Sequence, residues 1–261
     1  TQTVSLPTGT NNMITKIITH DGIFHADDVM SVALMLECIR PKIQVERTRN
    51  ISPDEFSNPD IWIIDVGRQY NRALNNYDHH QDKTLPASCI LILNQMHSME
   101  YISIELYRTL FDALVEISEI DCNGPIGKNG FQFNSLIKSF NNLEDGFDKA
   151  LWVCRNYIKS CKADVEKTEQ SLKIWNEGES VSCYIKVCSE FPAHWKRYEQ
   201  HPLLIFPNEG KWTLISANSD HFPIWATGKE LFIHSNKFLA VFETKADAIE
   251  CAQASAYNAV G

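Results

Sequence analysis

The chain lacks both a long hydrophobic run and an excess of positive charge. A membrane-spanning helix needs about 20 predominantly apolar residues, so we expect no membrane partner. The formal net charge is −9, whereas proteins that grip long duplexes usually carry a basic stripe. We therefore expect no binding to extended duplex DNA. The polar start, residues 1–13, lacks the charged and apolar regions of a signal peptide, which predicts a flexible arm.

The eight cysteines include no CxxC pair, which argues against a zinc ribbon. Several of them fall on apolar faces of predicted helices, where a free thiol behaves as a small hydrophobic group. Buried free thiols are typical of a reducing compartment. We therefore expect a cytoplasmic protein, with the nucleus or the mitochondrion as alternatives in a eukaryote.

What the chain does have is carboxylates and imidazoles that follow hydrophobic segments. The groups are His20, His25 and Asp27 after residues 14–19, Asp65 after residues 61–64, and Asp78, His79 and His80 in a turn further along. Strands of a parallel sheet end at one crevice, which would bring these groups together. Hard oxygen ligands combined with neutral imidazoles suit a pair of divalent ions.

The hydrophobic periodicity predicts an α/β fold in the first half. The expected strands are 14–19, 43–46 and 60–66, and the expected helices are 26–40, 86–96 and 102–117. Strands alternating with helices predict right-handed βαβ units, and therefore a mainly parallel sheet with flanking helices over residues 14–143.

The second half has a different texture. Glycine and asparagine between 123 and 142 predict a surface loop, and a long helix is expected to connect the domains over 144–180. Short strands and a last helix then predict a smaller α+β domain at 181–261. The expected elements are strands at 181–187, 203–206, 212–217, 231–234 and 238–242 and a helix at 244–258.

Two carboxylates need a partner by position alone. Asp65 ends a central apolar strand, where a carboxylate is costly unless it meets cations or donors. Its two oxygens can bridge two metal ions. Asp121 ends a predicted helix, where an acid opposes the helix dipole, and a metal ion would relieve that conflict. Asp28 is left out of the site, because an acid at a helix start is explained equally well as a cap.

Four motifs resemble those of the MYG1 family of DHH-type metal phosphoesterases. They are T-H-x-G-x-F-H-x-D-D at 19–28, I-D-V-G at 64–67, D-H-H-Q at 78–81 and I-D-x-x-G at 120–124. The resemblance is highly specific in the first eighty residues and looser after Gly124. It implies a DHH-type fold, a second domain that binds substrate, and metal-dependent hydrolysis of phosphate esters.

The resemblance also implies a ligand set for two divalent ions. One ion would be held by His20, His25 and Asp65, and the other by Asp27, Asp65, His79 and Asp121. The candidate catalytic residues are Asp78, which would orient the imidazoles, and His80, which would face the substrate phosphate. Oxygen and nitrogen ligands without thiolate favour Mn²⁺, with Mg²⁺, Co²⁺ and Zn²⁺ as alternatives.

Substrate contacts are expected from both domains. The second domain should close over the substrate, with His234 and Lys237 as phosphate contacts, and Arg68 is a further candidate. Arg68 stands where the family usually has glycine, and residues 219–228 replace a longer segment. These departures leave the predicted metal ligands intact and bear on substrate choice.

The leading hypothesis is a two-metal phosphodiesterase acting on RNA or short oligonucleotides, because the MYG1 family is linked to 3′–5′ exoribonuclease activity. The ions would activate water for an in-line displacement. The alternatives are a hydrolase of small phosphate substrates, such as pyrophosphate or a cyclic dinucleotide, and a non-catalytic protein that binds metal or nucleotide. A structural zinc protein would need a closed four-ligand site. Oligomer formation is left open.

Overall fold

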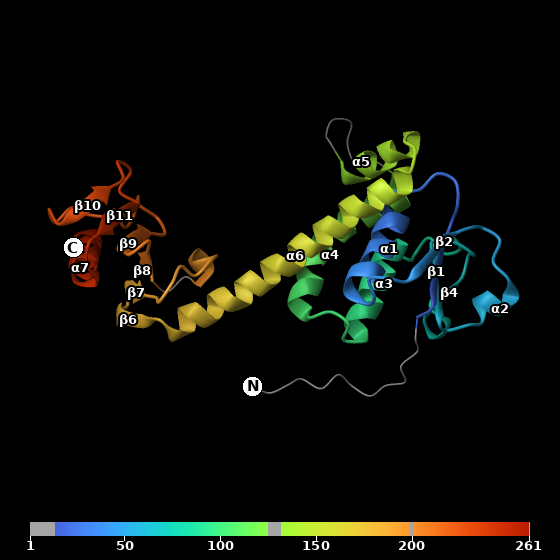
Figure 1. Cartoon of the computed structure of the whole chain (residues 1–261), viewed down its shortest axis with the longest axis horizontal. Helices are drawn as coiled ribbons and strands as arrows, with labels where there is room; N and C mark the ends of the chain where they lie inside the picture. Colours follow the sequence, from blue (N-terminus) through green and yellow to red (C-terminus); the bar gives the residue numbers. More distant parts are fainter. Residues whose placement is uncertain (1–13, 125–131, 199–200, 261) are drawn as a thin grey trace. The chain divides into compact units, whose positions relative to one another are not determined.

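The computed structural model describes residues 14–124, 132–198 and 201–260. The chain forms two compact units, one reaching Ala163 and the other starting at Asp164, within the long helix α6 (Gly146–Glu177). Each unit has its own sheet (Figure 1). The sequence predicts that this helix is a separate connector between the domains, and those domain limits stay a prediction. The arm expected at 1–13 lies outside the described residues.

The first unit is built on a five-stranded sheet in the order β2-β1-β3-β5-β4. The strands are β1 (Lys16–Thr19), β2 (Gln44–Arg47), β3 (Ile61–Ile64), β4 (Tyr70–Asn71) and β5 (Asn76–Tyr77). β1 pairs in parallel with β2 and β3, and β3 pairs in parallel with β5, whereas β4 is antiparallel to β5 at the edge. The predicted mainly parallel sheet is confirmed.

Strand β3 lies in the middle of this sheet because it is apolar on both faces. All four of its residues are buried, as expected for a parallel strand that is covered on both sides. Helix α1 (Ala26–Cys38) is buried from Ala26 to Leu36. It packs against α3 (Ser88–Ser98), which also packs against α4 (Ile104–Asn123). These helices bury the apolar side chains of the first unit.

The chain turns sharply where β3 ends. Asp65 has φ +55° and Gly67 has φ +94°, both in the left-handed region. A Cβ atom on Gly67 would lie 2.6 Å from the ring of Phe56, so glycine suits both the conformation and the close approach. The strand ends at Ile64, and the turn places Asp65 directly after the carboxyl end of this central strand.

The second unit contains a six-stranded sheet in the order β10-β11-β9-β8-β7-β6. The strands are β6 (Glu179–Ser182), β7 (Ile185–Val187), β8 (Leu203–Asn208), β9 (Lys211–Ser216), β10 (Glu230–Ile233) and β11 (Leu239–Phe242). Only β7 and β8 pair in parallel within the described part of this sheet. Helix α7 (Lys245–Val260) packs against β7, β8, β9 and β11. The predicted α+β architecture is confirmed.

Some local predictions are wrong. The second half of the loop predicted over 123–142 forms α5 (Phe133–Ser139) and the 3₁₀ turn η2 (Phe140–Asn142), while 125–131 lie outside the described residues. The single strand predicted at 181–187 is a hairpin of β6 and β7, whose turn is held by Tyr184 N donating to Ser182 Oγ at 3.2 Å. Within the described ranges, no helix combines the length and apolarity needed to cross a membrane.

Candidate metal centre

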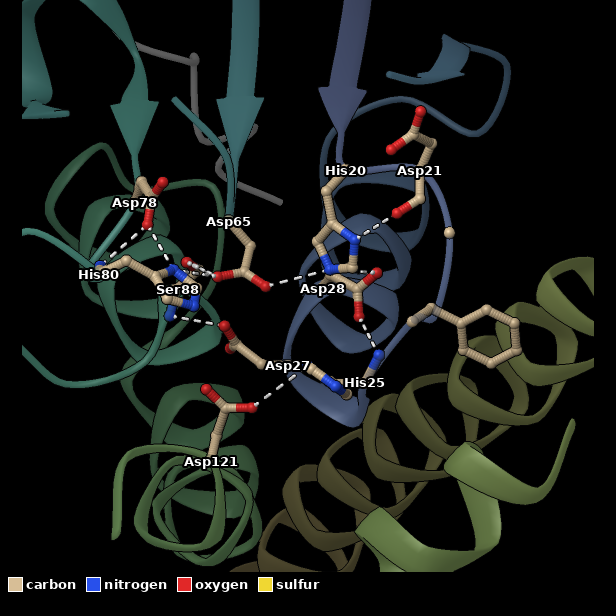
Figure 2. Close-up of polar contacts among 12 residues, drawn as sticks. His20, Asp21, His25, Asp27, Asp28, Asp65, Asp78, His80, Ser88 and Asp121 are labelled. Carbon is tan, nitrogen blue, oxygen red and sulfur yellow. Dashed lines mark hydrogen bonds and ion pairs between the residues drawn. The ribbon is translucent and has the colours of Figure 1, made fainter. Parts of the chain in front are cut away.

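Carboxylates and imidazoles gather where β1, β3 and β5 end (Figure 2). The groups are His20 after β1, Asp27 and Asp28 in the first turn of α1, Asp65 after β3, Asp78, His79 and His80 after β5, and Asp121 in the last turn of α4. Neighbouring parallel strands point their carboxyl ends the same way, which explains why segments so far apart in the sequence meet here.

One cluster surrounds the buried imidazole of His79. Its Nε2 atom lies 3.4 Å from Asp65 Oδ1, 3.3 Å from Asp121 Oδ2 and 3.9 Å from Asp27 Oδ2. Three carboxylates from three different elements therefore face one ring nitrogen. These four residues are the ones predicted to hold the second ion.

A second cluster surrounds His20, whose side chain is also buried. Its Nε2 atom lies 3.4 Å from Asp28 Oδ2 and 3.5 Å from Asp65 Oδ2. His25, predicted beside His20, is placed differently. Its side chain is 47% exposed, and its Nδ1 atom lies 3.9 Å from Asp121 Oδ1. Asp28, which the sequence reading left out, occupies the position beside His20 instead.

Asp65 lies between the two clusters. Its Oδ1 atom faces His79 at 3.4 Å, and its Oδ2 atom faces His20 at 3.5 Å. Ser88 Oγ donates to Oδ1 at 3.4 Å. This two-sided placement is what a carboxylate that bridges two ions would need.

Backbone N–H groups at the start of α3 hold Asp27. Ser88 N donates to Asp27 Oδ2 at 3.0 Å, and Cys89 N donates to Asp27 Oδ1 at 2.7 Å. A helix N-terminus favours a carboxylate, because its first N–H groups have no partner within the helix. Sequence reasoning missed this support, since backbone donors leave no mark in the side-chain pattern.

Asp78 binds the residues around it in a way that fits its predicted role toward His80. Its Oδ1 atom accepts from His80 N at 2.9 Å and lies 2.8 Å from His80 Nδ1, and its Oδ2 atom accepts from Arg68 N at 2.7 Å. The His80 side chain is 52% exposed, so it lies at the surface of the centre. The Asp78 hydrogen bonds among the described residues reach His80, and none reaches His79.

Burial raises the pKa of both carboxyls that open α1. The pKa of Asp27 lies well above its usual value because the group is desolvated and because Asp65 is nearby. Burial raises the pKa of Asp28 to about 7, against the opposing effect of His20. Burial would raise the pKa of Asp65 too, but contacts with His20 and His79 hold it below its usual value.

The same contacts act on the imidazoles in the opposite direction. Burial lowers the pKa of His20, but its contacts with Asp65 and Asp28 outweigh burial and raise the pKa to about 9. Burial also lowers the pKa of His79, and Asp121 with Asp65 raises it to about 11. A centre that draws protons onto buried histidines has a strongly negative field, which a divalent cation can neutralise.

Two buried ligand atoms in this centre have no well-oriented hydrogen bond within the described residues. They are Asp28 Oδ2 and His79 Nε2. Buried polar atoms are nearly always paired, and a metal ion would pair both. The donor groups that come within 4.8 Å of one another are His20 with Asp28 and Asp65, Asp65 with His79 and His80, and His79 with Asp121 and Cys122. Apart from the Cys122 thiol, these groups offer the oxygen and nitrogen ligands that fit divalent ions such as Mn²⁺ and Mg²⁺.

Two clefts open onto the centre. One, of about 270 Å³, is lined by His20, His25, Asp65 and His80 together with Arg49 and Arg68. Arg68, a predicted substrate contact, lines this cleft, and its part in binding a substrate stays a prediction. Arg49, which also lines the cleft, was not among the predicted site residues. Its Nε atom lies 3.1 Å from Asp21 Oδ1. The two arginines bring positive charge to this cleft.

The other cleft, of about 260 Å³, is lined by His25 and Asp121 and by residues of α5, including Ser135 and Lys138. Sequence reasoning missed this wall because it predicted a loop there.

The remaining predicted substrate contacts, His234 and Lys237, lie in the second unit. The centroids of the His234 and Phe238 rings are 4.3 Å apart. The Nζ atom of Lys237 lies 4.7 Å from the centroid of the Trp225 ring. Both contacts are local, and the part these residues play toward a substrate stays a prediction.

A protein-family model named MYG1_exonuc, described as an uncharacterised protein family (UPF0160), matches residues 16–89. The resemblance to the MYG1 family is confirmed. The matched segment contains His20, His25, Asp27, Asp65 and His79, while Asp121 lies beyond it.

Curated MYG1 proteins match the chain to different extents. The one from Chlamydia trachomatis is 32% identical over 133 residues, which cover 49% of this chain and 45% of the relative. The one from Chlamydia pneumoniae is 28% identical over 88% of this chain and 92% of the relative. The mouse MYG1 exonuclease is 37% identical over 27% of this chain and 19% of the relative. The matched segment thus spans about half the length of the first of these relatives.

A pGpG-specific phosphodiesterase from Vibrio, PggH, aligns over 95% of this chain and 100% of its own with 12% identity and a TM-score of 0.34. RecJ from Thermus thermophilus, in complex with Mg²⁺, aligns over 98% of this chain and 53% of its own with 13% identity and a TM-score of 0.30. Likeness at this level carries no conclusion about function.

Proposed function

We propose that the chain is a metal-dependent phosphodiesterase that shortens RNA or short oligonucleotides, acting as a 3′–5′ exonuclease. The observation that carries the proposal is the placement of Asp65, whose two oxygens face the buried imidazoles of His20 and His79 at 3.5 and 3.4 Å. The names of the mouse, rat and human relatives, MYG1 exonuclease, support an exonuclease activity.

The proposed centre holds two divalent ions, Mn²⁺ by preference. The ligands taken from the sequence are His20, His25 and Asp65 for one ion and Asp27, Asp65, His79 and Asp121 for the other. Bound ions of this kind lower the pKa of a water and neutralise charge on the phosphate. The N–H groups of Ser88 and Cys89 keep the Asp27 carboxylate in place for this task.

The remaining groups of the cleft bind and orient the phosphate. His80 Nδ1 is engaged with Asp78 Oδ1 at 2.8 Å, which leaves Nε2 as the ring atom available to a phosphate oxygen. Arg68 and Arg49 line the same cleft and supply charge to the phosphodiester. His234 and Lys237 are proposed as further phosphate contacts from the second unit.

A second candidate is a hydrolase of small phosphate substrates such as pyrophosphate or a cyclic dinucleotide. The size of the arginine-lined cleft, about 270 Å³, favours it, because such a space suits one or two nucleotide-sized groups better than a long strand.

The test compares three substrates with Mn²⁺: a short RNA labelled at its 5′ end, a dinucleotide and pyrophosphate. The proposal expects a ladder of RNA products shortened from the 3′ end. Cleavage of pyrophosphate alone would favour the second candidate, and binding of Mn²⁺ without cleavage of any substrate would indicate a non-catalytic protein.

The matched variant is Asp65→Asn, which keeps the shape of the side chain and removes its charge. Because even groups that only support a metal ligand cost 10- to 100-fold when removed, we expect turnover to fall by at least about 100-fold. Asp21→Asn is the control, since that carboxylate lies in the loop between β1 and α1, is exposed and pairs with Arg49 of the segment after β2. Asp65→Asn with undiminished Mn²⁺-dependent turnover would contradict the site.

A further inference from the structure

We propose that Asp28, and not His25, completes the ligand set of the ion beside His20 and Asp65. The inference rests on the two-ion centre of the proposed function and changes its composition. Asp28 is fully buried, and it comes from the first turn of α1, one residue after Asp27. Figure 2 shows its carboxylate between the His20 ring and the start of the helix.

The tautomer of His20 directs its lone pair to the carboxylates. The Nδ1 atom lies 3.0 Å from the carbonyl oxygen of Asp21. A carbonyl oxygen only accepts, so Nδ1 carries the hydrogen and, in the neutral ring, Nε2 carries the lone pair. Arg49 Nη2 also approaches Nδ1, but at 3.4 Å, and it lies 3.5 Å from the Asp21 oxygen as well.

Two carboxylate oxygens face this lone pair. Asp28 Oδ2 lies 3.4 Å and Asp65 Oδ2 lies 3.5 Å from His20 Nε2. When His20 is neutral, as a metal ligand must be, three electron-rich atoms face one another at these distances, and a cation among them removes their repulsion. Because the three donor atoms lie within 4.8 Å of one another, a single ion can bind all three.

Helix capping accounts for only one of the two carboxylate oxygens of Asp28. Its Oδ1 atom accepts from His25 N at 2.7 Å, as a residue at this position of a capping box does. The Oδ2 atom is buried and has no hydrogen bond within the described residues. A metal ion accounts for a buried oxygen that has no hydrogen bond within the described residues and faces two other ligand atoms.

His25 takes a different place. Its backbone N–H anchors Asp28. Its half-exposed ring lines the same cleft as His20 and Asp65, but its Nδ1 atom lies 3.9 Å from Asp121, and His25 does not belong to the close donor group of His20, Asp28 and Asp65. The two rings are 6.0 Å apart, centroid to centroid. The proposed first-ion set is therefore His20, Asp28 and Asp65.

The additional carboxylate changes the charge of the centre. Four carboxylates, from Asp27, Asp28, Asp65 and Asp121, balance two divalent ions, so the loaded centre has no formal excess of positive charge. A phosphate then needs cations from elsewhere. Arg49 and Arg68 line the cleft beside this ion, which gives the two arginines a reason to be there.

The test is Mn²⁺ binding to Asp28→Asn, measured by calorimetry and by elemental analysis after dialysis. Asparagine keeps an oxygen that can accept from His25 N, so the helix start is preserved while the charge is removed. We expect two ions in the wild type and one in Asp28→Asn, with the affinity of the lost ion reduced at least tenfold. His25→Gln should keep both ions, and Asp21→Asn is the loop control.

A second variant guards against a folding defect. Asp28→Glu introduces glutamate, the usual residue at this position of a capping box, and moves the second carboxylate oxygen. Without metal, its free energy of unfolding should equal that of the wild type, and it should bind the first ion more weakly. If Asp28→Asn and Asp28→Glu both bind two ions with wild-type affinity, or if His25→Gln loses an ion, the inference is wrong and the two-ion centre stands. A wild type that binds no ion would instead remove the proposed function itself.

Discussion

At the scale of single residues, Asp65 combines burial with an uncommon backbone conformation. Its φ of +55° lies in the left-handed region, which few residues other than glycine adopt, although Asp is among the more tolerant. Residues held there cost on the order of 1–3 kcal/mol and tend to occur at functional sites. The turn sets the two oxygens between His20 and His79. The strain at Asp65 is therefore consistent with a residue placed for binding.

Cys122 also offers a test at the scale of single residues, because it contacts the ring nitrogen of His79 that does not face the carboxylates. Its Sγ atom lies 3.7 Å from His79 Nδ1. Metal-binding histidines usually donate their second N–H to an acceptor, and loss of that acceptor costs 10- to 100-fold in affinity. We expect Cys122→Val to weaken Mn²⁺ binding by about that factor and Cys122→Ser, which keeps an acceptor, to weaken it less.

Calorimetric titration with Mn²⁺ measures the effect. Cys183→Val is the control, since Cys183 is an exposed cysteine in the second unit. Equal affinities for Cys122→Val and this control would show that the sulfur does not orient His79.

At the scale of elements, η2 supports the loop between β1 and α1. Asn141 Nδ2 donates to Phe24 O at 2.9 Å, and Phe24 N donates to Asn141 Oδ1 at 3.0 Å. Asn141→Ala would leave both backbone groups of Phe24, a buried residue, without these partners, which costs about 1–3 kcal/mol. We expect lower stability in urea and weaker Mn²⁺ binding, because His20 and His25 flank this loop.

Asn156→Ala is the matched control for the urea and Mn²⁺ measurements. Its side chain donates to Trp152 O within its own helix. If Asn141→Ala behaved like this control in both measurements, η2 would have no part in holding the loop.

Lys16 of β1 pairs with two glutamates. Its Nζ atom lies 2.7 Å from Glu55 Oε1 on α2 (Pro53–Phe56) and 2.8 Å from Glu46 Oε2 on β2. Hydrogen bonds from Lys16 and Ser52 lower the pKa of Glu55 to about 2, from an ordinary 4.5. A lowered folded-state pKa means that the pair stabilises the fold above pH 4.5 and that this contribution is lost as pH falls toward 2.

Glu55→Gln should therefore cost about 1 kcal/mol at neutral pH, a usual value for a partly exposed pair, and nothing near pH 2. The measurement is the free energy of unfolding as a function of pH, with Asp54→Asn as the control on the same helix. A loss that is the same at both pH values would rule out the ion pair as its cause.

The elements that sequence reasoning found and missed differ in a physical way. β3 is recognisable because four apolar residues are buried on both faces, whereas β4 and β5 have two residues each and offer no periodicity to read. The ligand candidates follow from polar groups at strand ends. The second oxygen of Asp28 does not, because a capping acid and a ligand look the same in sequence until Oδ2 is seen facing His20.

At the scale of the whole molecule, the charge of the chain and the chemistry of the centre oppose each other. A formal charge of −9 attracts divalent cations and repels a polyanion such as RNA. The two arginines of the cleft and the proposed ions reverse this field locally. The affinity of this chain for an oligonucleotide should therefore depend strongly on Mn²⁺. A basic nucleic-acid-binding protein, by contrast, supplies the positive charge with its own side chains.

The division into two units leads to the last prediction. Each unit has its own sheet and core, and all predicted metal ligands lie in the first. A ligand that binds only the folded state stabilises it by about 2.7 kcal/mol at 100 times its dissociation constant. We expect Mn²⁺ to slow hydrogen exchange in peptides from 14–124 and to leave peptides from 203–242 unchanged. Asp65→Asn should abolish the effect, and equal protection of both regions would show that the second unit also binds the metal or folds together with the first.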